Sequence, residues 1–194
     1  MRALGIVTLV VLVAFLGVVC KPAVEAPQAY ASHELRGVSF NYPSGWIDET
    51  QEAINEMTEA GIEPGWEEYM ALTAWTDPSG SAGLFVFVFD LEAMKVPELI
   101  TDEEKQAFAG AFMGGLMTEV ETPTLHRQEE IRVSGEWAWE AEFSGTMEGL
   151  AVKGHSLTAF HGRDAFWLMY FAEDIVWDKL GGVYDRVKQS ISFD

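Results

Sequence analysis

The densest group of residues that could do chemistry is a run of carboxylates between positions 48 and 68. Its members are Asp48, Glu49, Glu52, Glu56, Glu59, Glu63, Glu67 and Glu68. No lysine or arginine lies between Arg36 and Lys95, so no nearby basic side chain in the sequence neutralises them. Helical spacing would place Glu49, Glu52, Glu56 and Glu59 along one face.

Three interpretations of this acidic segment stay open. A row of carboxylate oxygens is suited to weak calcium binding, and a strongly negative face is suited to docking a basic partner. The third interpretation is a solvated acidic face, because the spacing of an EF-hand loop is absent from the segment. Calcium is the one cofactor that the sequence suggests, and no other is expected.

Histidine-based chemistry has weak support. His126, His155 and His161 form neither an H-x-H nor an H-E-x-x-H pattern, so a zinc site is not expected. Ser156 follows His155 directly, but adjacent residues of a strand point to opposite faces, so the two cannot act as a dyad. The G-x-S-x-G motif of serine hydrolases is missing as well.

Paired carboxylates also occur at Glu140 and Glu142, which would lie about 7 Å apart on one face of a strand. That distance suits the acid and base of a glycosidase, but any exposed alternating strand produces it. Neither of the glycine-rich phosphate-binding motifs is present. We therefore expect a protein that is not an enzyme, with a hydrolase of unrecognised site as an alternative.

Tryptophan is abundant, with seven residues, and most are expected in the core. Trp137 and Trp139 alternate in a strand pattern that would bury both. Trp46, Trp66 and Trp75 lie nearer to predicted turns and could instead line an apolar pocket.

Composition limits the class of partner. The net charge is −19, from 31 acidic and 12 basic residues, which repels nucleic-acid phosphates and anionic lipid surfaces. Cys20 is the single cysteine, so neither an intrachain disulfide nor a cysteine-rich metal site can form. Apolar residues make up 48% of the chain and charged residues 22%, which predicts a folded domain.

The first twenty residues have the pattern of an export signal or membrane anchor. Arg2 precedes an uninterrupted apolar stretch over 3–19 that ends at Cys20. Three outcomes fit: cleavage before Cys20 with lipid attached to it, an uncleaved N-terminal anchor, or cleavage after Ala31. We expect an extracytoplasmic protein associated with the cell membrane, with a linker over 21–34 and one domain over 35–194.

The helices and strands that must position these residues follow one another in an irregular order. Strand patterns occur over 37–43, 69–76, 83–91, 129–133, 136–143, 150–160 and 165–171, the last two joined as a hairpin around His161-Gly-Arg-Asp164. Helices are predicted over 51–60, from Thr101 to about Met117, and from Asp174 onward. The order predicts an α+β fold: an α/β/α sandwich with a central antiparallel sheet and helices on both faces.

Two segments carry a family resemblance. Val38-Ser-Phe-Asn-Tyr-Pro-Ser-Gly-Trp46 resembles the F-x-Y-P-x-x-W opening of the PsbP-like family, which includes DcrB-type lipoproteins. The ending Val187-Lys-Gln-Ser-Ile-Ser-Phe193 resembles the closing segment of the same family. The resemblance covers about 35–194 and implies the sandwich above, an extracytoplasmic and membrane-associated protein, and an accessory or binding role. Under this hypothesis the partner is an envelope protein complex or a small ligand.

Overall fold

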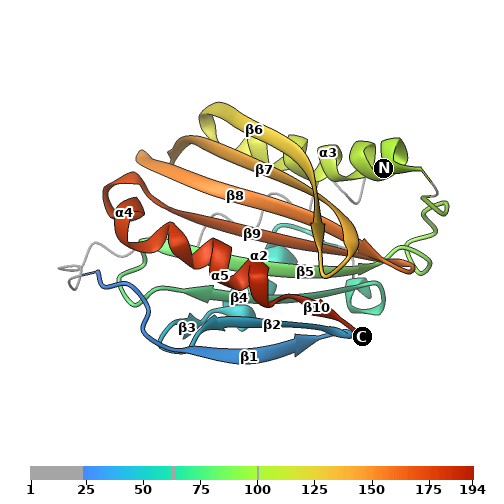
Figure 1. Ribbon diagram of the computed structural model, residues 1–194, viewed down its shortest axis with the longest axis horizontal. Coiled ribbons are helices and arrows are strands. Elements are labelled where there is room, and N and C mark those ends of the chain that lie inside the picture. Colours follow the sequence, from blue (N-terminus) through green and yellow to red (C-terminus); the bar gives the residue numbers. More distant parts are fainter. Residues whose placement is uncertain (1–23, 63, 100) are drawn as a thin grey trace.

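The computed structural model describes residues 24–62, 64–99 and 101–194. Within these ranges two antiparallel sheets pack face to face (Figure 1). The smaller sheet has the order β1-β2-β10 and consists of β1 (Tyr30–Leu35), β2 (Val38–Pro43) and β10 (Ser192–Phe193). The two segments that carry the family resemblance therefore lie side by side, since Phe193 of the closing segment pairs with Val38 of the opening one.

The larger sheet has seven strands in the order β3-β4-β5-β9-β8-β7-β6, and each neighbouring pair is antiparallel. Its strands are β3 (Ile47–Asp48), β4 (Met70–Thr76), β5 (Ala82–Asp90), β6 (Glu121–Val133), β7 (Glu136–Met147), β8 (Leu150–His161) and β9 (Asp164–Glu173). The long strands β6 to β9 follow one another through tight turns, so chain neighbours are also sheet neighbours.

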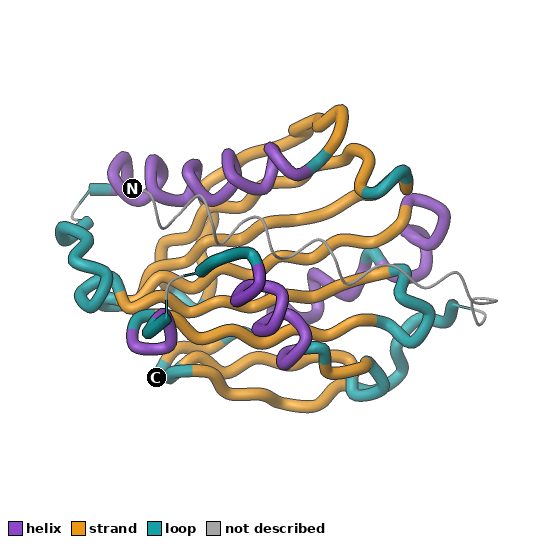
Figure 2. Tube along the Cα trace, turned by 180° about the vertical axis from the view of Figure 1, so that it is seen from behind, coloured by secondary structure: helices purple, strands orange, loops and turns teal. Residues whose placement is uncertain are grey.

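Helices cover both faces of the larger sheet, as the sequence predicts. On one face lie α2 (Thr50–Glu59), the short 3-10 helix η2 (Trp66–Glu68) and α3 (Asp102–Glu119), the last of which lies over the β6–β8 side of the sheet in Figure 2. The other face is covered by the smaller sheet together with η3 (Asp174–Val176), α4 (Trp177–Leu180) and α5 (Gly182–Ser190). The α+β sandwich expected from the sequence is therefore confirmed.

Strand β5 shows why two separate cores form. Its run of apolar residues has no polar face, and such a strand must be covered on both sides. Phe85 and Phe87 join the core beneath α2 and α3, whereas Leu84 and Val86 join the core beneath α5 and the smaller sheet. All four side chains are fully buried.

Local signals in the sequence set the helix boundaries. The predicted capping box begins α3: Glu104 N donates to the Thr101 hydroxyl, and the Glu104 carboxylate accepts from Thr101 N. The helical segment expected from Asp174 onward buries Leu180, Val183 and Val187 on its inner face. A Cβ at Gly181 would meet Trp177 of the same segment.

Two boundaries differ from the sequence prediction. Tyr30–Leu35 forms β1, although residues up to 34 were assigned to the linker, because an edge strand with one solvated face carries little apolar signal. Strand β6 begins at Glu121, eight residues before the predicted strand over 129–133. Its first eight residues are exposed at the free edge of the sheet and show no apolar pattern. Their backbone still pairs with β7.

Candidate binding site

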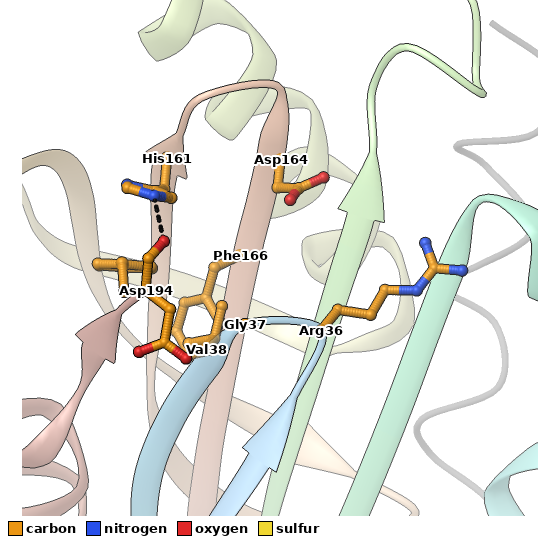
Figure 3. A pocket seen from close by; sticks show the side chains of 8 residues that line it. Arg36, Gly37, Val38, His161, Asp164, Phe166 and Asp194 are labelled. Carbon is orange, nitrogen blue, oxygen red and sulfur yellow. Dashed lines mark hydrogen bonds between the residues drawn. The ribbon is translucent and has the colours of Figure 1, made fainter.

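A cavity of about 300 Å³ lies at one end of the sandwich, where the two sheets meet (Figure 3). Two tight turns bring its walls together. Arg36 and Gly37 connect β1 to β2 with φ of 47° and 74°, and Gly162, with φ of 56°, turns β8 into β9. Left-handed residues in two-residue turns match the twist of antiparallel strands. Residues at both turns line the same cavity, so the two hairpins end close together.

The inner part of the cavity is apolar. Val38 of β2 and Phe166 of β9 line it and are only 3% and 1% exposed. Phe193 of β10 contributes a third apolar wall and packs edge-on against Phe166, with ring centroids 6.1 Å apart. The residues of the family resemblance thus form part of this cavity.

His161 closes one side of the cavity with both ring nitrogens engaged. Its Nδ1 lies 3.0 Å from the Glu136 carboxylate and its Nε2 lies 3.0 Å from the Asp194 carbonyl oxygen (Figure 3). The hydrogen bond to Glu136 raises the pKa of His161, and the bond to Asp194 acts in the same direction. A histidine held by two acceptors is poorly placed to remove a proton from a molecule in the cavity.

Asp164 stands at the rim, and its carboxylate accepts no hydrogen bond from the described residues. Burial raises the pKa of Asp164, and repulsion from Asp90, its cross-strand partner on β5, raises it further. Arg36 and His161, the latter the cross-strand partner of Asp164 on β8, counteract this effect by their charge. Arg36 acts only from a distance, because its guanidinium donates to the carbonyl oxygens of Glu67 and Glu68 at 2.7 and 3.3 Å. Within the described ranges the rim therefore carries a carboxylate without a hydrogen-bond partner.

A second buried carboxylate, Glu140, lies under α5 and is 2% exposed. Its Oε1 accepts from the Tyr184 hydroxyl and the Lys188 ammonium, both at 2.6 Å, and its Oε2 accepts from Arg127 at 3.2 Å. Burial would raise the pKa of Glu140, but the hydrogen bonds from Lys188 and Tyr184 outweigh burial and lower it. Glu140 was expected on a half-exposed face; α5 covers it instead, so it cannot pair with Glu142 as a catalytic acid and base.

The acidic segment is spread over three short elements. Asp48 lies in β3, Glu49 caps α2, and Glu67 and Glu68 lie in η2. Along α2, Glu52, Glu56 and Glu59 lie near one another. Burial raises the pKa of Glu56, and the charges of Glu52, Glu59, Glu148 and Glu49 raise it further.

No group of three or more histidine, cysteine or acidic side chains in the described ranges could hold a metal ion. Calcium binding by the acidic segment stays a prediction. Glu63 and Cys20, the remaining predicted site residues, lie outside the described residues. In residues 24–62, 64–99 and 101–194, no helix combines the length and apolar character needed to cross a bilayer.

The other histidines lie in separate places. His155 stacks on Tyr184 with centroids 4.2 Å apart, and Ser156 accepts a hydrogen bond from Trp167 on the opposite face of the sheet. The prediction that His155 and Ser156 cannot act together is confirmed. His126 lies on the edge strand β6, with its Nε2 2.7 Å from the Ser144 hydroxyl of β7.

The three tryptophans near turns share no pocket. Trp66 belongs to the core beneath α2, and Trp75 belongs to the core beneath the smaller sheet, where Tyr42 stacks on it at 4.4 Å. Trp46 lines a cavity of about 300 Å³ together with Glu25 and Pro78. Aromatic residues of the F-x-Y-P-x-x-W segment thus attach the smaller sheet to the larger one.

Comparison with solved structures decides the fold. Cyanobacterial PsbP (CyanoP) from Synechocystis sp. PCC 6803 superposes with a TM-score of 0.61, covering 92% of this chain and 99% of that chain at 15% identity. The chain has the PsbP fold. A second PsbP-like match is PA94 from Pseudomonas aeruginosa, a protein of unknown function, with a TM-score of 0.50, coverage of 85% and 97%, and 9% identity. No protein-family model and no curated protein sequence matches the chain.

Sequence reasoning did not single out the cavity. Its walls come from three stretches far apart in the chain, and Asp164 was noted only as the last residue of a predicted hairpin turn. The usable signal was the pair of tight turns, Arg36-Gly37 and Gly162-Arg163, each followed by a strand.

Proposed function

We propose that this chain is a membrane-tethered, extracytoplasmic and non-catalytic accessory module that docks an envelope protein complex with the cavity end of its PsbP fold. The observation that carries this proposal is the cavity itself. It has an apolar interior formed by Val38 and Phe166 and an unpaired carboxylate at its rim, and it opens on a chain of net charge −19. Such a surface attracts a partner with basic side chains.

The position of the cavity supports docking by a tethered domain. Strand β1 enters from residues 24–29 and runs toward Arg36, so the cavity lies at the opposite end of β1 from that entry (Figure 1). Six strand residues span about 20 Å. A tether upstream of Val24 would leave the cavity facing away from the membrane, where a partner can reach it.

The hydrogen bonds already made by His161 and Glu140 favour a binding role over catalysis. His161 has both ring nitrogens engaged, and Glu140 is held by three donors beneath α5. Both residues are therefore occupied by contacts within the chain, and Glu140 does not line the cavity. The PsbP fold of the two solved structures is compatible with this role.

Membrane tethering through Cys20 is part of the proposal, and the structure bears on the competing cleavage site. Cleavage after Ala31 would cut β1, whose first two residues pair with Pro43 and Tyr42. It would also remove Val24, whose carbonyl accepts from Lys179, and Ala29, whose carbonyl accepts from Ser44 N. We expect mass spectrometry of the mature protein to find lipid on Cys20; a mature chain that begins at Ser32 would contradict the tether.

Site-directed photocrosslinking tests the docking role. A photoreactive residue replaces Arg36 at the cavity rim, and a matched control replaces Ile175, which is 87% exposed at the opposite end of β9. In intact membranes of cells that express the full chain, we expect one stoichiometric adduct from position 36 and none of that adduct from position 175. Identical adducts from both positions, or no adduct from either, would contradict the proposal.

A further inference from the structure

The polar and apolar parts of the cavity are separated, and this separation indicates what kind of group the cavity can bind. Val38, Phe166 and Phe193 form the inner walls, and the carboxylates of Asp164 and Asp194 stand at the rim. Neither side-chain carboxylate accepts a hydrogen bond from residues 24–62, 64–99 or 101–194. A group that fills this space must therefore be apolar along its length and positively charged at its end.

The chain offers little basic charge of its own to the rim. The Arg36 guanidinium points away from Asp164 in Figure 3 and is held by the carbonyl oxygens of Glu67 and Glu68. His161 brings a positive charge near Asp164 when it is protonated, but its two ring nitrogens are engaged by Glu136 and Asp194, so it donates no hydrogen bond to the Asp164 carboxylate. Asp90 lies opposite Asp164 in the sheet register and adds a second negative charge nearby.

The volume of the cavity indicates how large a bound group can be. Its volume of about 300 Å³ is at the lower limit of small-molecule sites, which range from about 300 to 1,000 Å³. A single side chain fits this volume better than a drug-sized ligand. A compact ammonium on a flexible apolar stem suits carboxylates that stand apart at a rim, whereas a guanidinium fork suits one carboxylate approached in a plane.

We propose that the cavity receives a lysine side chain of a basic partner protein, with its stem against Phe166 and Val38 and its ammonium at Asp164. This inference rests on the proposed docking function and names the partner chemistry of the same site. Burial and the Asp90 charge raise the pKa of Asp164, and the positive charge of a bound ammonium would act in the opposite direction.

The test is a titration of the full chain, labelled with ¹⁵N in detergent micelles, with N-acetyl-lysine N-methylamide. N-acetyl-norleucine N-methylamide is the matched control, because it keeps the stem and lacks the ammonium. We expect saturable shifts of the Gly37 and Phe166 amide signals with a Kd of about 1 mM, and binding about tenfold weaker for norleucine. Equal binding of both probes, or no saturable shift with the lysine probe, would overturn the inference.

Two variants locate the interaction. Asp164→Asn removes the rim charge and is expected to weaken binding of the lysine probe about tenfold without changing binding of the norleucine probe. Asp178→Asn makes the same charge change on exposed α4, at the far end of β9, and is expected to leave both affinities unchanged. An unchanged affinity in a folded Asp164→Asn chain would exclude this site.

The outcomes of this titration and of the photocrosslinking are separable. A partner captured from position 36 without binding of the lysine probe would leave the docking role intact and exclude a lysine as its contact. Binding of the lysine probe without a captured partner would support the pocket chemistry and contradict the accessory role.

Discussion

Glu140 and Asp164 lie on the same face of the seven-stranded sheet, but their surroundings differ completely. Glu140 of β7 is covered by α5 and accepts hydrogen bonds from Tyr184, Lys188 and Arg127. Asp164 of β9 lies beyond α5, beside the smaller sheet, and accepts none from the described residues. The pKa of Glu140 is lowered although burial acts against it, whereas burial and Asp90 raise the pKa of Asp164.

The difference separates a carboxylate that holds the fold from one that is available to a partner. The Glu140 network ties α5 to β7 and to the edge strand β6, so its donors are satisfied inside the chain. At Asp164 the fold leaves a charge without a partner next to an apolar cavity, which costs stability and is kept where a ligand can compensate.

The largest expected effect follows from removal of Glu140. Glu140→Ala leaves the Lys188 ammonium and the Tyr184 hydroxyl without their acceptor beneath α5, and we expect a loss of about 3 kcal/mol in the free energy of unfolding. Urea denaturation followed by tryptophan fluorescence measures it. Glu142→Ala is the matched control on the same strand face, since Glu142 makes no hydrogen bond or ion pair within the described ranges. Equal losses for the two variants would show that the network contributes nothing specific.

A smaller effect is expected from Tyr184→Phe, which removes one donor to Glu140 and keeps the ring that stacks on His155. We expect a loss of about 1–2 kcal/mol, because one hydrogen bond to a buried charge is broken. Combining Tyr184→Phe with Glu140→Gln gives a double-mutant cycle. Additive losses would contradict a direct contribution of this bond.

Lowering the pH should change the contributions of Glu140 and Asp164 to stability in opposite directions. The lowered pKa of Glu140 contributes stability that is present above the unfolded-state value and lost as pH falls through the folded-state pKa. The raised pKa of Asp164 has the opposite consequence: its ionised form destabilises the fold, and this cost disappears as the carboxyl is protonated. Stability measured against pH for Glu140→Gln and Asp164→Asn should therefore diverge from the parent chain in opposite directions; parallel curves would contradict the comparison.

The smallest effect is expected from Asp164→Asn at neutral pH. The variant removes an unpaired charge and its repulsion with Asp90, so we expect the free energy of unfolding to rise slightly, by no more than about 0.5 kcal/mol. Thermal unfolding at neutral pH shows whether the variant is more or less stable than the parent chain. A loss above about 1 kcal/mol would identify Asp164 as a structural residue like Glu140.

The sequence was most informative where local signals agree with the tertiary fold. The helix expected from Thr101 begins there with a capping box, and the strand expected over 83–91 corresponds to β5. The F-x-Y-P-x-x-W resemblance led to the PsbP fold that the superposition shows. Strands β1 and the first half of β6 escaped prediction because edge strands need backbone pairing, which leaves no apolar pattern.

By itself, the sequence determined the strongly negative charge, the helices and strands with strong periodicity, and the pattern of an export signal ending at Cys20. Charge and periodicity are properties of a chain segment, so they are readable without a partner segment. The tertiary structure alone decided which carboxylates are paired. Glu140 and Glu142 look equivalent in an alternating strand, and only the docking of α5 buries the first, while only the meeting of β2, β9 and β10 places Asp164 at the mouth of a cavity.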